Sequence, residues 1–171
     1  MTERERLTLR DPGEFLELAK GRVDAVVSDA DLSAFSVVFT LLRAADRVAY
    51  DLDTVHRPLG WTWPGFRLLF WLWLLGPLEP REIAPLASTS RASVSSALNT
   101  LERDGFVLRH RNSSDRRLVT VELTERGRER IAAAFEAHHA RERDWMQVFT
   151  EKERATLAEL LSRLLAASVP A

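Results

Sequence analysis

The feature of this sequence that most constrains its fold is a change in the spacing of apolar residues at Asp104 and Gly105. Before this point, apolar residues recur every three or four positions, as they do in amphipathic helices. After it, they alternate with polar residues at 106–111 and 118–123, as they do in half-buried strands. The NSSD sequence between these two segments is rich in turn-forming residues, so we expect an antiparallel hairpin.

Helices are expected on both sides of this hairpin. The segment 64–75 is apolar on nearly all sides, so its helix must lie at the centre of the fold. Thr124 is a good N-cap, and Thr150 with Glu153 forms a T-x-x-E capping box. The expected helical ranges are 14–27, 32–56, 64–75, 80–87, 90–103, 124–148 and a last helix from 150 onward. The predicted fold class is therefore mainly α with one small β-hairpin.

The composition excludes several kinds of site. The 171 residues include no cysteine, which rules out disulfides, thiolate zinc sites and cysteine redox switches. The most apolar stretch, 68–75, has eight residues, whereas a helix that crosses a bilayer needs about 20. The N-terminal residues lack the apolar core of a signal peptide. We therefore expect one globular, cytoplasmic protein without membrane contact.

Positive charge is concentrated in one central segment, although the whole chain has a net charge of only -1. Residues 81–117 hold seven arginines against four acidic residues, so this segment is basic and the rest is acidic. Four of these arginines and one histidine lie within the nine residues 109–117, at the expected hairpin. Such a distribution indicates a local surface that binds anions.

Two short helices followed by a basic hairpin are typical of a winged helix-turn-helix. In that fold the second helix enters the DNA major groove and the hairpin reaches along the backbone. The helix 90–103, capped by Ser88 or Ser90, has one apolar side and one side of small polar residues. A polar surface helix would show the same pattern, but the adjacent arginines favour DNA contact. The predicted DNA-facing residues of this helix are Ser90, Arg91, Ser95, Ser96, Asn99 and Arg103.

The segment SRASVSSALNTLERDGFVLRHRNSSDRRLVTVELTERG resembles the MarR family of bacterial transcription factors. The resemblance lies in L-E-x-x-G after the second helix, Asp-Arg-Arg in the hairpin and L-T-x-x-G after it, and it covers roughly residues 35–169. It implies that Arg116 and Arg117 enter the minor groove, where arginine reads shape rather than base identity. It also implies that Asp115 braces these two arginines.

The same resemblance implies a homodimer whose terminal helices interleave and whose two winged modules read a short palindrome. The implied regions are dimerisation helices at 1–60, a DNA-binding module at 61–123 and further dimerisation helices at 124–171, in one interwoven domain. The C-terminal helix carries a leucine stripe that a single chain leaves without a partner, which favours a two-fold interface. The stripe consists of Leu157, Leu160, Leu161, Leu164 and Leu165.

Members of this family often release DNA when a small aromatic anion binds between the dimer helices and the winged module. The sequence WTWPGFRLLFWLW supplies large aromatic side chains, and the preceding helix supplies arginine. The candidate ligand-binding residues are Phe39, Arg43, Trp63, Phe66, Phe70 and Trp73. In the alternative interpretation these residues are ordinary core, and Arg43 belongs to an ion pair.

No catalytic or metal site is predicted. His138 and Glu142 have the i, i+4 spacing of metal ligands, with His139 beside them, but no further ligand accompanies them. Catalytic motifs such as G-x-S-x-G, the P-loop and H-E-x-x-H are missing from the sequence, so we expect neither an enzyme nor a cofactor. The predicted function is a ligand-responsive repressor that binds double-stranded DNA. The alternative is a winged-helix adaptor that binds proteins and not DNA.

Overall fold

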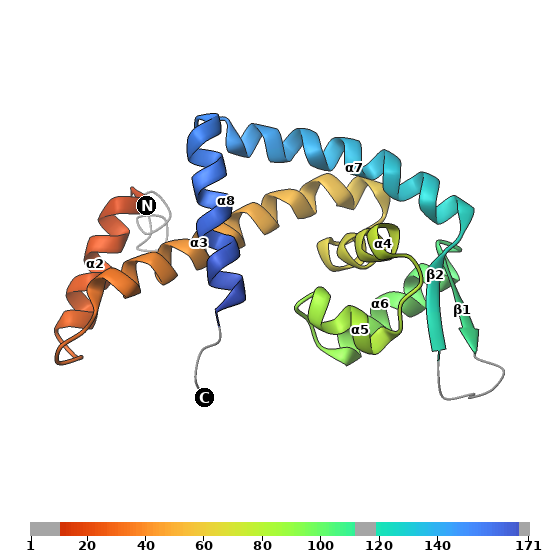
Figure 1. The fold of residues 1–171 in the computed structure, drawn as a ribbon, viewed down its shortest axis with the longest axis horizontal. Helices are drawn as coiled ribbons and strands as arrows, with labels where there is room; N and C mark the ends of the chain where they lie inside the picture. The colour runs from red at the N-terminus through yellow and green to blue at the C-terminus, as the bar shows by residue number, and fades with distance from the viewer. Residues whose placement is uncertain (1–10, 112–118, 168–171) are drawn as a thin grey trace, which may run out of the picture. The chain divides into compact units, whose positions relative to one another are not determined.

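The fold is mainly helical with one two-stranded sheet, as the sequence predicts (Figure 1). The computed structural model describes residues 11–111 and 119–167. Its elements are α2 (Pro12–Asp24), α3 (Leu32–His56), a 3-10 turn (Arg57–Leu59), α4 (Trp63–Leu75), α5 (Pro80–Leu86), α6 (Arg91–Arg103), β1 (Val107–Arg111), β2 (Val119–Leu123), α7 (Glu125–Met146) and α8 (Glu151–Ala166). None of the helices in the described ranges is long and apolar enough to span a membrane.

The chain divides into two compact units, Met1–Tyr50 and Asp51–Ala171. This boundary lies inside α3, so the last turns of that helix belong to the second unit. The predicted division into 1–60, 61–123 and 124–171 stays a prediction.

In the first unit an aromatic contact joins α2 to α3. The ring centroids of Phe15 on α2 and Phe39 on α3 are 6.2 Å apart, and Phe35, also on α3, stacks on Phe39 at 5.3 Å. The helix α2 begins two residues before the predicted start because Asp11 caps it, accepting the backbone N–H of Gly13 at 2.8 Å. It has no buried residue.

The second unit is built around α4. Its residues Phe66, Leu68, Leu69 and Leu72 are almost completely buried, which confirms that the apolar helix is central. The helix packs against α5, α6, α7 and β2, and these elements complete one hydrophobic core. The core therefore fixes α6 and the hairpin relative to α4.

The helix caps are the ones that the sequence suggests. Of the two candidates, Ser90 caps α6 and accepts the backbone N–H of Ser93 at 3.1 Å. Thr124 caps α7. The capping box of Thr150 and Glu153 is present at the start of α8.

The hairpin pairs β1 with β2 in antiparallel register, from Val107 opposite Leu123 to Arg111 opposite Val119. The strand β1 begins one residue later than predicted, and Leu118, the predicted first residue of the second strand, lies outside the described residues. The backbone of Leu78, just before α5, also pairs with Val121 through bonds of 3.0 and 2.8 Å, a bridge that was not predicted. This bridge fastens the hairpin to the helical part of the unit.

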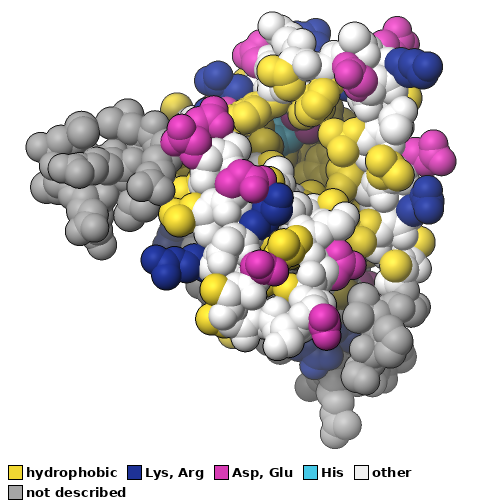
Figure 2. Space-filling model, turned by 90° about the vertical axis from the view of Figure 1, so that its left-hand side faces the viewer, with side chains coloured by type: hydrophobic (Ala, Val, Ile, Leu, Met, Phe, Trp, Pro, Cys, Tyr) yellow, Lys and Arg dark blue, Asp and Glu magenta, His cyan; other side chains and the backbone are white. Residues whose placement is uncertain are grey.

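Large hydrophobic side chains remain open to solvent, and Figure 2 shows several of them among charged side chains on one face. In α8 no residue is buried, and Leu160, Leu164 and Leu165 are 51%, 52% and 87% exposed. In α3 the exposed hydrophobic residues include Val37, Val38, Leu42 and Tyr50. Three leucines of the predicted stripe are therefore exposed, whereas Leu157 and Leu161 are half-buried.

Candidate nucleic-acid interface

The helix α6 presents a polar side to solvent because its apolar side is fully packed. Val94, Leu98 and Leu101 are buried against the core. The residues predicted to face DNA, Ser90, Arg91, Ser95, Ser96, Asn99 and Arg103, are all exposed. The predicted two-sided character of this helix is confirmed, whereas contact with DNA stays a prediction for each residue.

Asn99 is held in place by an arginine of the hairpin. The guanidinium of Arg109, on β1, donates to Asn99 Oδ1 at 2.8 Å and lies 3.3 Å from a carboxylate oxygen of Glu102. The contact fixes which way the Asn99 amide points, and the amide nitrogen is left as a donor for a base edge. Sequence reasoning counted Arg109 only as part of the basic hairpin. The contact of Arg109 with α6 depends on how the strand and the helix pack, so no local sequence pattern predicts it.

Other arginines of this unit form ion pairs that are open to solvent. Arg103 lies 3.1 Å from Asp104, and Arg81 lies 2.7 Å from Glu79, with both guanidinium groups well exposed. Exposed ion pairs of this kind contribute little to stability, so the arginine can readily exchange its carboxylate partner for a DNA phosphate. The predicted minor-groove residues Asp115, Arg116 and Arg117 lie outside the described residues.

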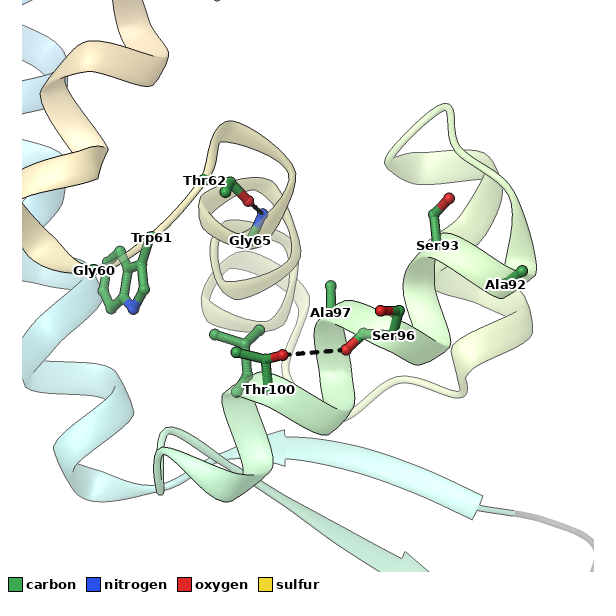
Figure 3. A pocket seen from close by; sticks show the side chains of 10 residues that line it. Gly60, Trp61, Thr62, Gly65, Ala92, Ser93, Ser96, Ala97 and Thr100 are labelled. Atoms are coloured by element: carbon green, nitrogen blue, oxygen red, sulfur yellow. Dashed lines mark hydrogen bonds between the residues drawn. The ribbon is translucent and has the colours of Figure 1, made fainter.

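A hollow of about 560 Å³ lies beside α6, between this helix and the start of α4 (Figure 3). Its walls are mainly small residues, several with hydroxyl groups: Gly60, Trp61, Thr62, Gly65, Ala92, Ser93, Ser96, Ala97, Thr100 and Leu101. Of these, only Ser96 was among the predicted site residues. The lining carries no formal charge.

The start of α4 offers no free anion site at this hollow. The Asp53 carboxylate accepts the backbone N–H of Trp63 at 2.6 Å and the Arg57 side chain at 2.7 Å, and these bonds hold the pKa of Asp53 below its usual value. The Thr62 hydroxyl oxygen accepts the backbone N–H of Gly65. A carboxylate therefore already occupies the positive end of this helix, so attraction for DNA must come from the arginines.

The aromatic residues predicted for ligand binding on α4 form one continuous cluster. Ring centroids are 5.9 Å apart for Trp63 and Phe66, 6.3 Å for Phe66 and Phe70, and 6.3 Å for Phe70 and Trp73. Phe135 of α7 extends the cluster, 5.8 Å from Phe70. Sequence reasoning missed Phe135 because it lies on a distant helix.

The other two predicted ligand residues, Phe39 and Arg43, belong to the first unit. The guanidinium carbon of Arg43 lies 4.5 Å from the centroid of Phe15 and 5.6 Å from that of Phe39, so it stacks on aromatic rings of its own unit. That Phe39 and Arg43 share a site with the residues of α4 stays a prediction.

A buried pair of histidines joins the end of α3 to α7. His56 Nε2 lies 3.2 Å from His138 Nδ1, and His138 Nε2 lies 3.1 Å from Glu142. Burial, together with His138, lowers the pKa of His56 to about 4, and burial also lowers the pKa of His138 against the effect of Glu142. With both rings neutral, His56 donates to His138, which donates to Glu142. His56 was missed because it lies 82 residues before its partner.

These groups form no metal site. Among the residues that the structure describes, there is no cluster of three or more His, Cys, Asp and Glu side chains arranged to hold a metal ion. His139 contacts Glu142 at 3.0 Å on the surface, beside the buried pair.

Comparison with known proteins places this geometry among DNA-binding regulators. The model of the MarR family matches residues 61–119. Over 139 residues the chain is 32% identical to YwaE of Bacillus subtilis (strain 168), named as an uncharacterized HTH-type transcriptional regulator, and the match covers 81% of each protein. These names describe transcriptional regulators rather than enzymes.

Two solved structures have a similar fold. The transcriptional regulator PA4135 matches with a TM-score of 0.71 and 29% identity, over 77% of this chain and 97% of that one. The transcriptional repressor CouR, bound to a 23-mer DNA duplex, matches with a TM-score of 0.70 and 27% identity, over 81% of this chain and 99% of CouR.

Proposed function

Since this chain belongs to the MarR family of DNA-binding transcriptional regulators, we propose that it is a repressor that binds a short palindrome as a homodimer. The observation that carries the proposal is the exposed polar side of α6, on which Arg109 orients Asn99 for a base edge. The similar repressor CouR is bound to DNA in its structure, which supports the same use of this fold here. Because its target is DNA, we propose that the protein acts in the cytoplasm.

The dimer is supported by the uncovered leucines of α8. Three of them are at least half exposed, although an apolar stripe of this kind is normally buried in a small soluble protein. An isologous contact buries the same stripe on both chains and relates the two α6 helices by a two-fold axis. A two-fold protein reads a palindrome because each half-site meets the same surface.

Selection of bound duplexes from a random DNA library tests this proposal. We expect the selected sequences to contain two inverted half-sites, and each half-site alone to bind much more weakly. Recovery of no common sequence would contradict specific DNA recognition. Recovery of a single asymmetric half-site would contradict the palindrome and the dimer, while DNA binding itself would stand.

A response to a small aromatic anion is the second part of the proposal. The support is the continuous aromatic cluster of α4, whose rings offer flat apolar walls. Thermodynamic coupling must be reciprocal, so DNA has to weaken ligand binding by the factor by which the ligand weakens DNA binding. Titration of the DNA complex with aromatic acids, followed by fluorescence anisotropy, tests the release.

The alternative function, an adaptor that does not bind DNA, is not supported, because the relatives of this protein are DNA-binding regulators.

A further inference from the structure

Arg109 joins the hairpin to α6 and is more enclosed than the arginine at the end of that helix. Its side chain is 27% exposed, whereas that of Arg103 is 73% exposed. Arg109 lies in β1 opposite Val121, and its guanidinium reaches two side chains of α6, Asn99 at 2.8 Å and Glu102 at 3.3 Å. Because the Glu102 carboxylate balances its charge, Arg109 is less available to a DNA phosphate than an exposed arginine is.

The contact with Arg109 decides which end of the Asn99 amide faces outward. A guanidinium has donors and no acceptor, so the amide oxygen must face it, because a reversed amide would set donor against donor. The amide nitrogen therefore points away from Arg109. Within residues 11–111 and 119–167 this nitrogen makes no hydrogen bond, and Asn99 is exposed. Asn99 is thus left with two N–H donors on the exposed side of α6.

Glu102 keeps this arrangement in place. Its carboxylate lies against Nη1 of the Arg109 guanidinium, while Nη2 donates to Asn99. Asn99 and Glu102 are three residues apart on α6 and therefore lie on the same side of the helix. Turning the guanidinium toward another group would break a charge-assisted contact. The three side chains therefore form one unit, in which Asn99 offers its amide nitrogen to a base.

An asparagine held in this way differs from a free one in the base that it suits. A free asparagine pairs with adenine, accepting from the N6 amino group and donating to N7. Here the amide oxygen is already engaged by a cation, so the adenine amino group, a further donor, is disfavoured beside it. Guanine presents two neighbouring acceptors in the major groove, N7 and O6, whereas cytosine presents a donor. The amide nitrogen of Asn99 is therefore complementary to guanine.

We propose that Arg109 and Glu102 are positioning residues that make Asn99 read guanine, and not adenine, in each half-site. The Asn99 amide nitrogen donates to guanine N7 and O6, and Arg109 acts through Asn99 without contacting DNA. The inference rests on the specific DNA binding proposed above, and it names the base that the site contains at the position facing Asn99.

The test measures binding of the full chain to the selected operator, with each of the four bases placed in turn at every half-site position. The position that faces Asn99 is the one at which Asn99→Ala makes all four affinities equal. There we expect the wild type to bind guanine about tenfold more tightly than adenine. Replacing this guanine by 7-deazaguanine, which lacks the N7 acceptor, should weaken binding of the wild type and have no effect on binding of Asn99→Ala.

The variants separate positioning from a merely structural role. Arg109→Ala frees the amide oxygen, so this variant should still prefer a purine but bind adenine at least as tightly as guanine. A merely structural Arg109 would weaken all duplexes alike and leave the ratio of guanine to adenine affinity unchanged. Arg81→Ala, which removes an exposed arginine of α5, is the matched control and should keep the wild-type ratio.

A second variant decides if circular dichroism shows that Arg109→Ala does not fold. The carboxylate of Asn99→Asp can still pair with Arg109, but it has no donor, so the preference for guanine should vanish. The proposal would be overturned by a wild-type preference for adenine, by equal binding of guanine and 7-deazaguanine, or by a guanine preference that survives Arg109→Ala or Asn99→Asp. It would also be overturned if Asn99→Ala equalised no position.

These outcomes distinguish this inference from the proposed function. A palindrome that carries adenine at the Asn99 position overturns the inference alone, and the repressor proposal stands. A selection that recovers no common sequence overturns both.

Discussion

At the scale of single residues, the proposed recognition of DNA depends on a side chain that another side chain orients. Asn99 Oδ1 accepts a hydrogen bond from Arg109, which fixes the direction of its amide. We predict that Asn99→Ala relaxes base preference at one position of each half-site, by about 1–3 kcal/mol if the contact is bidentate. Affinity measurements on operators with single base changes check this, and equal weakening on all of them would place Asn99 outside the reading surface.

Arg109 supplies the matched control for this prediction. We expect Arg109→Ala to reduce the same base preference less than Asn99→Ala does. The double variant should resemble Asn99→Ala alone, because Arg109 acts through the asparagine. Additive effects of the two substitutions would mean that Arg109 contacts DNA independently.

At the scale of elements, α7 approaches the end of α6 and the start of β1 so closely that only glycine fits at position 127. A Cβ on Gly127 would overlap the carbonyl oxygen of Phe106. Thr124 also donates to the Gly105 carbonyl at 2.8 Å, so the T-x-x-G sequence fastens α7 to the chain before the hairpin. We predict that Gly127→Ala lowers the free energy of unfolding by about 1–3 kcal/mol in urea titrations. Gly21→Ala, where a Cβ meets nothing within 4 Å, should raise it by about 0.5–1 kcal/mol.

The predicted wing residues Arg116 and Arg117 carry a second prediction at this scale. These residues lie outside the described chain, and the expectation comes from the Asp-Arg-Arg sequence alone. Replacing both arginines by alanine should weaken binding to DNA of any sequence. The slope of log affinity against log salt should fall by about 0.9 for each phosphate that the protein no longer neutralises. An unchanged slope in a folded double variant would contradict the wing assignment.

The contact between α3 and α7 makes stability depend on pH. Burial lowers the pKa of His56 to about 4 from its ordinary value of 6.5, so between these pH values the unfolded chain binds the extra proton and the native protein does not. The stabilisation is therefore fully present above pH 6.5 and falls as the pH drops toward 4, by about 3 kcal/mol for a shift of this size. Urea unfolding at fixed protein concentration over this range measures it. His56→Phe should flatten the dependence.

At the scale of the whole molecule, the prediction concerns association. Leu160, Leu164 and Leu165 of α8 are at least half exposed in the single chain, so we expect a stable homodimer. Leu161→Asp combined with Leu165→Asp should give monomeric or unfolded protein that no longer holds a palindrome. Ala155→Asp combined with Ala166→Asp adds the same charges on the opposite side of the helix and should leave the dimer intact. Sedimentation that shows a wild-type monomer at micromolar concentration would refute the dimer.

The sequence by itself determined the local structure of this protein. The apolar spacing placed the helices and strands largely within one to three residues, and Ser90, Thr124 and Thr150 marked helix starts correctly. The motif from Ser90 to Gly127 was enough to indicate the family, because that motif is contiguous. Periodicity, capping and turn chemistry act over a few residues, which is why a linear pattern records them.

Only the tertiary structure decided how distant residues combine. The contact of Asn99 with Arg109, the pairing of His56 with His138 and the bridge from Leu78 to Val121 all join separate elements. Each of these contacts depends on which faces of the helices and strands lie against one another. The packing of the whole core decides this, and no local sequence pattern records it.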